Sequence, residues 1–227
     1  MLLKTEECLV LTKDLKTQNL LIGVKLLIGI FGGPFAPDVA KRIWLLIGSD
    51  SYTDWEESFL FKNKSENYIA AKEWFARIES KVDKMRSDND PVFRGDNSLW
   101  KKTIEDPLKP HSTKCDYSVP YIPQSNGRLE RKIRTNKNLI RTNLFGVDKR
   151  VWGHCAKYVS YNRNRHPRRK FKGKSPFEMR YGRKAKKGFF RRFGCLAFAK
   201  VDVPENLPAM VPRYEPGIFL GYSNSNS

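Results

Sequence analysis

Cysteine and histidine are scarce in this chain of 227 residues, and their spacing excludes the usual metal and disulfide frameworks. The four cysteines, at positions 8, 115, 155 and 195, lie far apart and form no CxxC pair, and the three histidines are equally scattered. Structural zinc sites take closely spaced cysteine and histidine pairs. Disulfide-rich folds are shorter and carry more cysteines. We therefore expect neither, and a reducing compartment fits this cysteine content.

Long apolar runs are also nearly absent. The run from Asn19 to Ala36 is interrupted only by Lys25, but it is marginal in length for a membrane helix. Its four glycines and Pro34 favour strand and turn instead. Acidic residues precede the run, which does not fit the positively charged start of a secretory signal. We expect no membrane partner.

Acidic residues are missing from one part of the chain only. Residues 128–200 contain 24 lysines and arginines and 3 acidic residues, a local charge of +21, whereas the remainder contains 19 and 21, a local charge of −2. A solvated surface usually mixes both signs. Positive charge gathered in one segment favours a polyanion, with nucleic acid as the first choice and an anionic membrane surface as the weaker alternative.

The chain is organised around the stretch 117–141, YSVPYIPQSNGRLERKIRTNKNLIR. Two prolines predict an extended segment up to position 123, and Ser-Asn predicts a helix that starts near Asn126. Apolar and amide side chains then share one stripe of that helix. These are Leu129, Ile133, Asn136, Ile140 and Leu144. Glu130 lies off the stripe, in the first turn, on the same face as Arg134, Lys137 and Arg141. A first-turn glutamate is also favoured by the helix dipole without any function.

The string PYIPQSNGRLERKIRT resembles the PYTPQQNGVAERKNRT segment of copia-type retrotransposon integrases. In that family the glutamate of NGxxER is the third catalytic carboxylate, which here is Glu130. RSDN resembles the family's RSDNG, whose aspartate is the second catalytic carboxylate, here Asp88. The motifs SPFE, FGC and GIFLGY follow in family order. The resemblance covers about residues 8–222.

One position departs from the family pattern. The predicted first strand, residues 24–31, should carry the first catalytic aspartate four residues before a proline, and that position is Ile30, or Gly29 if the alignment slips by one. Neither can bind a metal. Asp50 falls in a turn, where aspartate is common, and is not expected to substitute. Asp90 replaces a family glycine, adds negative charge near the site and tolerates positive φ less well than glycine.

The resemblance implies an α/β fold of the RNase H-like kind, a mixed five-stranded sheet with flanking helices, followed by a helical extension and a small β module. Strands at 24–31, 42–48 and 55–61 predict an antiparallel meander. We further expect a helix from Ser65 to about Lys81, a strand at 82–88, helices at 97–105, 148–163 and after the capping box of Ser175, and strands at 189–201 and 217–222.

The expected domains are a remnant of the zinc module that precedes integrase cores (1–20), a catalytic core (21–165), and a basic extension with the β module (166–227). Cys8 is followed by Leu11 where the module has its second cysteine, so the zinc finger cannot form and a truncated copy is expected.

The resemblance implies strand transfer of element ends into target DNA, catalysed by two Mg²⁺ (or Mn²⁺) ions on Asp88, Glu130 and the first-strand aspartate. With that aspartate missing, we expect little or no activity. It also implies DNA as partner, a homo-oligomer, and action in the nucleus. The residues expected to contact nucleic acid are Asn126, Arg128, Arg131, Lys132, Arg134, Lys137, Arg141, Arg168, Arg169 and Lys170. A non-enzymatic nucleic-acid-binding protein derived from a transposon is the alternative. Another RNase H-like nuclease would not explain the motifs after the core.

Overall fold

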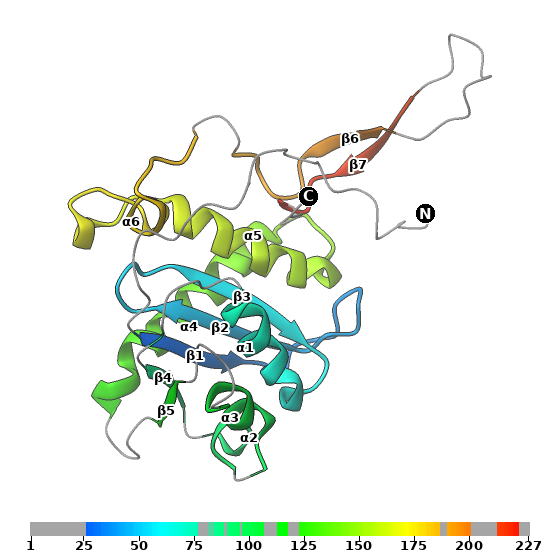
Figure 1. Ribbon diagram of the computed structural model, residues 1–227. Coiled ribbons are helices and arrows are strands. Elements are labelled where there is room, and N and C mark those ends of the chain that lie inside the picture. The colour runs from blue at the N-terminus through cyan, green and yellow to red at the C-terminus, as the bar shows by residue number, and fades with distance from the viewer. Residues whose placement is uncertain are drawn as a thin grey trace.

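A five-stranded mixed sheet forms the frame of the protein (Figure 1). The computed structural model describes residues 26–76, 82, 84–88, 90–95, 97–106, 113–117, 123–186, 190–200 and 213–222. The expected zinc-module remnant at 1–20 lies outside these ranges. The strands are β1 (Leu26–Gly32), β2 (Trp44–Asp50), β3 (Glu56–Phe61), β4 (Lys84–Ser87) and β5 (Lys114–Tyr117), in the order β3-β2-β1-β4-β5. The first three are antiparallel, as the sequence predicted, and β4 and β5 add in parallel.

Helices cover both faces of this sheet. One face carries α1 (Asn67–Phe75), α2 (Pro91–Arg94) and α3 (Leu99–Ile104), and the other carries α4 (Pro123–Asn143) and α5 (Trp152–Arg165) (Figure 1). Strand β2 is buried on both sides: Leu46 packs in the core with α1 and α3, while Leu45 and Ile47 pack in the core with α4 and α5. A central strand of this kind reads as a continuous apolar run, because neither face meets water.

The central helix α4 starts earlier than the sequence predicted. It begins at Pro123, not near Asn126. Proline is favoured in the first helical turn, because the N–H that it lacks has no partner there in any case. Farther along, Ile133, Asn136 and Ile140 are buried, as the predicted stripe requires. Of the segment predicted to be extended, Tyr117 lies in β5, Pro123 is helical, and residues 118–122 lie outside the described ranges.

The helices after α4 follow their start signals. The 3₁₀ turn η2 (Lys149–Val151) leads into α5, and Asp148 caps η2 by accepting a hydrogen bond from the Arg150 N–H. Helix α6 (Pro176–Tyr181) has the predicted capping box, in which Ser175 and Glu178 bond to each other's backbone N–H. Within the described part of the chain, no helix is both long and apolar enough to cross a bilayer.

Three predicted elements have different bounds in the structure. The helix expected from Ser65 starts as the 3₁₀ turn η1 (Lys64–Glu66), because the Glu66 carboxylate turns back to accept from the Lys62 N–H at 3.2 Å. The last two strands are β6 (Leu196–Lys200) and β7 (Tyr214–Ile218), a separate antiparallel hairpin. Strand β6 cannot reach back to position 189, since Gly194 turns the chain at φ 75°. In Figure 1 this hairpin extends away from the sheet.

Candidate functional site

The register between β1 and β4 shows where the position expected to carry the first carboxylate lies. Gly29 is paired with Ser87 in parallel, so the next positions along, Ile30 and Asp88, are neighbours at the end of the pairing. Ile30 is also paired with Ile47 of β2, which lies in the core beneath α4 and α5. Residues paired across a ladder share one face of the sheet. Position 30 is therefore beside Asp88 on the α4 side.

Gly29 and Gly32 show on which face of the sheet each of the two alternative positions, 29 and 30, lies. A Cβ on Gly29 would lie 3.4 Å from Leu46 Cδ1 and 3.8 Å from Trp100, in the core on the opposite face. A Cβ on Gly32 would meet Ile133 of α4 at 2.9 Å. Strand positions alternate between faces, so position 30 shares the α4 side with position 32, and position 29 does not. Of the two candidate positions, 30 and not 29 therefore shares the α4 side of the sheet.

Asp88 lies directly after β4 and is half-buried. Its Oδ1 accepts a hydrogen bond from the Asp90 N–H at 3.3 Å. Burial raises the pKa of the Asp88 carboxyl, the Asp90 N–H lowers it, the Asp90 charge raises it and Lys64 lowers it. A cation bound nearby would favour the ionised form of this carboxyl.

Asp90 does not strain the turn, contrary to the sequence-based expectation. Its φ is −59°, an ordinary value for any residue, and its carboxylate caps α2 by accepting from the Val92 N–H at 3.1 Å. The added negative charge is paired with Lys64. Lys64 also lies 4.6 Å from the Trp44 ring centroid. Asp90 is thus a capping residue with its own counter-ion.

Glu130 lies on the exposed face of α4, where the sequence placed it. Arg134 and Arg141 are exposed and Lys137 is half-exposed on the same helix. Helix α4 runs along β1 in the same direction, because Gly32 lies against Ile133 and Lys137, and the Phe35 ring lies 5.5 Å from Lys137 Nζ. Glu130 is therefore on the N-terminal part of α4, beside the part of β1 that precedes Gly32. The side chains of Asn126 and Arg128 lie outside the described residues.

The donor set does not fit a two-magnesium site. Magnesium sites of this kind take oxygen ligands from several carboxylates, and position 30 supplies none. No cluster of three or more histidine, cysteine or acidic side chains suited to a metal occurs among the described residues. Asp50 cannot fill the gap, because its carboxylate is buried and accepts from the backbone N–H groups of Tyr52 and Thr53 at 3.0 Å and from the Thr53 hydroxyl.

Lys132 is not on the exposed basic face, contrary to expectation. It is buried, its Nζ lies 2.7 Å from Asp54 Oδ1, and it also donates to Ser49 Oγ. This pairing ties α4 to the β2–β3 turn, in which Asp54 has φ 62°. No local signal in the sequence predicts the Lys132–Asp54 pair, because the two residues are far apart in the chain. Among the other basic residues expected to contact nucleic acid, Arg131, Arg169 and Lys170 are exposed to solvent. Arg168 is half-buried.

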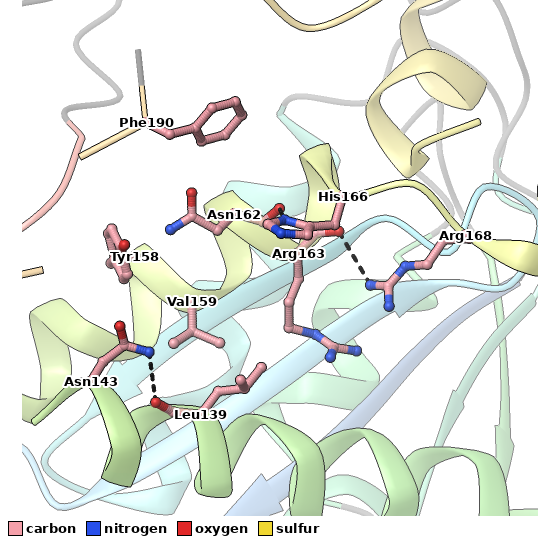
Figure 2. A pocket seen from close by; sticks show the side chains of 9 residues that line it. All are labelled: Leu139, Asn143, Tyr158, Val159, Asn162, Arg163, His166, Arg168 and Phe190. Carbon is pink, nitrogen blue, oxygen red and sulfur yellow. Dashed lines mark hydrogen bonds between the residues drawn. The ribbon is translucent and has the colours of Figure 1, made fainter. Parts of the chain in front are cut away.

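A cavity of about 380 Å³ between α4 and α5 was not indicated by the sequence (Figure 2). Leu139, Val159 and Phe190 supply apolar walls. Arg163 and Arg168 lie at one end, where Arg168 Nη2 donates to the Arg163 carbonyl at 3.2 Å. No carboxylate lines this cavity, so it is separate from the Asp88 edge.

No family model matches the chain, but curated proteins that are similar to it include two retrotransposon polyproteins. The retrovirus-related Pol polyprotein from transposon TNT 1-94 of Nicotiana tabacum is 24% identical over 196 residues, which cover 84% of this chain and 13% of the polyprotein. The corresponding polyprotein from transposon RE2 of Arabidopsis thaliana is 25% identical over 186 residues, 81% of this chain and 12% of the polyprotein. The chain thus spans about an eighth of these relatives.

Solved structures with a similar fold include retroviral integrases. The simian T-cell lymphotropic virus intasome in complex with PP2A regulatory subunit B56 gamma matches with a TM-score of 0.57 and 14% identity, over 90% of this chain and 72% of the viral one. The HTLV-2 integrase catalytic core in complex with magnesium matches with a TM-score of 0.54 and 15% identity, over 70% of this chain and 98% of the viral one. The BIV integrase catalytic core matches with a TM-score of 0.50 and 18% identity, over 70% of this chain and 94% of the viral one. The chain is a distant homologue of copia-type Pol polyproteins, and its fold matches retroviral integrase catalytic cores.

Proposed function

We propose that this chain is the integrase core of a retrotransposon Pol protein, and that it binds DNA but has lost most or all strand-transfer activity. The observation that carries the proposal is the isoleucine at position 30, in register beside Asp88 on the α4 side of the sheet. In an intact core, two magnesium ions activate the attacking oxygen and stabilise the leaving oxygen at phosphorus. Asp88 and Glu130 could contribute ligands to one such ion, but the ligand that both ions would share is missing.

DNA binding is supported by the charge of the exposed face of α4. Arg134, Lys137 and Arg141 follow Glu130 on one side of the helix. Glu130 is the single acidic residue in the sequence of α4. Contacts between such residues and phosphates position DNA without reading its sequence. This suits a protein that acts on many target sites. A nuclear site of action and a homo-oligomer belong to the same proposal.

A strand-transfer assay with repaired variants tests the proposal. Purified protein is given Mg²⁺ or Mn²⁺, a labelled duplex that mimics an element end, and a supercoiled target. We expect the parent to bind DNA without joining it, and Ile30→Asp to restore joining that is lost again in Ile30→Asp/Glu130→Ala. Ile30→Asn is the matched control, because it has nearly the same shape without the charge. Joining by the parent that Glu130→Ala abolishes would overturn the proposal.

Gly29→Asp tests the register itself. Its side chain would enter the core beside Leu46 and Trp100, where an unpaired charge is costly. We expect this variant to lose stability and to gain no joining activity. Restored joining in Gly29→Asp but not in Ile30→Asp would show that the first carboxylate belongs at position 29.

The alternative is a nucleic-acid-binding protein that no single substitution can return to catalysis. This alternative is favoured by the described residues, among which no three histidine, cysteine or acidic side chains are grouped as a metal site requires. DNA binding that persists in Ile30→Asp without any joining would support it. Loss of DNA binding on Arg134→Glu would then show that the α4 face still does the binding.

A further inference from the structure

A second cationic feature lies on α4, on a different side from Glu130. It is a hollow of about 250 Å³ between α4, the β2–β3 turn and the loop after α5. Its lining consists of Asp54, Arg131, Lys132, Thr135, Arg163 and Lys170. We propose that this hollow binds one phosphate group of a nucleic-acid backbone. The inference rests on the proposed DNA binding and names a second place where it occurs.

The two innermost cations of the hollow are already paired. Lys132 Nζ lies 2.7 Å from Asp54 Oδ1, and Arg163 Nε lies 2.7 Å from Oε1 of the buried Glu56. These pairs connect α4 and α5 to β3 and to the turn before it. The charges of Lys132 and Arg163 are therefore neutralised by their partners, and the net positive charge of the hollow comes from its outer residues.

The two outer cations, Arg131 and Lys170, are exposed and make no ion pair with another described residue. Arg131 Nε donates to the Gly127 carbonyl at 2.9 Å, which orients its side chain. Lys170 Nζ lies 4.8 Å from the Phe171 ring centroid. Two oriented cations thus flank the opening of the hollow.

Arg168 lies beside the hollow and lines the neighbouring cavity between α4 and α5. Its Nε is 3.9 Å from Asp54 Oδ2, too far for a hydrogen bond, and this buried atom has no hydrogen-bond partner among the described residues. Its Nη2 bonds to the Arg163 carbonyl (Figure 2). Burial lowers the pKa of Arg168 and the nearby Arg163 charge lowers it further, whereas Asp54 and Glu56 raise it. The charge of Arg168 adds to the positive potential around the hollow.

A phosphate group fits this arrangement better than a smaller anion. Arginine binds phosphate oxygens through two parallel N–H groups, and lysine adds a point charge. The hollow is several times larger than the ~30 Å³ occupied by a water molecule, so a tetrahedral phosphate can enter with water around it. Arg131 and Thr135 are one turn apart, on the α4 side marked by the Lys132–Asp54 pair. The hollow therefore contacts another stretch of backbone than the Glu130 face does.

Fluorescence anisotropy of the full chain with a labelled 30-base-pair duplex, at several salt concentrations, tests the proposal. Arg131→Ala/Lys170→Ala should weaken binding roughly tenfold, and should reduce the slope of log affinity against log salt by about one, as expected for one lost phosphate contact. Lys102→Ala is the matched control, because Lys102 is an exposed lysine on α3, on the opposite face of the sheet; it should bind as the parent does. Urea midpoints confirm that each variant is folded.

The failures of the two proposals can be distinguished. If the double variant binds DNA with the parent's affinity and salt slope while Arg141→Ala binds more weakly, the hollow is not a backbone site, although the proposed function stands. If the parent binds no DNA, the proposed function fails first. In a third arm, inorganic phosphate is added and the melting temperature is measured. Stabilisation of the parent but not of the double variant, with unchanged DNA binding, would assign the hollow to free phosphate and overturn the backbone assignment.

Discussion

Glu56, between β3 and α5, is held by several partners, whereas Asp88, at the end of β4, has few among the described residues. Glu56 is buried and pairs with Arg163, and the Asn164 amide bonds to both the N–H and the carbonyl of Glu56, at 2.8 and 2.7 Å. At the other edge, Asp88 accepts one backbone hydrogen bond from the described residues, at 3.3 Å, and its neighbour in register is an isoleucine. Under the proposed function, the interactions that hold the fold are in place while the set of metal ligands is incomplete.

This difference is what the proposed function, DNA binding without catalysis, would lead us to expect. Binding a nucleic-acid backbone needs only that α4 and the loop after α5 stay in place, with their cations exposed. Metal-assisted catalysis needs every ligand, because a missing carboxylate removes a share of the charge and of the geometry around both ions. The fold can therefore outlast the chemistry.

The largest stability effect is expected from breaking the Glu56–Arg163 pair. Arg163→Met leaves the Glu56 carboxylate buried without its counter-ion, which costs about 3–5 kcal/mol in the free energy of unfolding. Urea denaturation followed by circular dichroism measures the loss. Arg150→Met is the matched control, because the Asp148–Arg150 pair is exposed and exposed pairs contribute little. Equal shifts in the two variants would contradict the contrast between the two regions.

A smaller loss is expected at Asp50, the acidic residue closest to being a substitute ligand. Asp50→Ala removes a buried carboxylate that accepts three hydrogen bonds in the β2–β3 turn, and we expect a loss of about 2–3 kcal/mol in unfolding free energy. In an Ile30→Asp background, the same change should leave Mn²⁺ affinity unaltered. A large drop in Mn²⁺ affinity would show that Asp50 belongs to the metal site.

The smallest effect separates two serines that precede helices. Ser175→Ala removes the capping box of α6 and should cost about 1 kcal/mol. Ser65→Ala should cost almost nothing, because Ser65 lies inside η1, is exposed and caps no helix. Urea midpoints of the two variants make the comparison. A larger loss of stability in Ser65→Ala than in Ser175→Ala would show that Ser65 does cap a helix, as the sequence suggested.

Local signals in the sequence predicted much of the fold. The apolar run of β2, the buried stripe of α4 and the capping box at Ser175 follow from residue spacing and turn chemistry. The start of α4 was wrong by three residues, because Ser125 and Asn126 looked like caps while Pro123 is itself favoured in a first turn. Strand β6 was predicted too long, because nothing nearby shows that Gly194 adopts a positive φ.

Pairings between distant residues could not be predicted. Lys132 looked like another exposed cation of a basic helix, yet it is buried because Asp54, 78 positions earlier, reaches it. Asp90 looked like an unfavourable charge, yet Lys64 neutralises it. The choice between Ile30 and Gly29 also required the structure, because only the register with β2 and β4 shows which position faces α4.

Mn²⁺ binding to the parent, Ile30→Asp and Ile30→Asn, measured by electron paramagnetic resonance, tests the central claim most directly. The claim is that one carboxylate is missing at position 30. We predict weak Mn²⁺ binding by the parent and by Ile30→Asn, and binding at least about tenfold tighter by Ile30→Asp, as expected for an added charged ligand worth about 1.4 kcal/mol. Equal affinity of all three proteins would contradict the claim, as would tight binding by the parent.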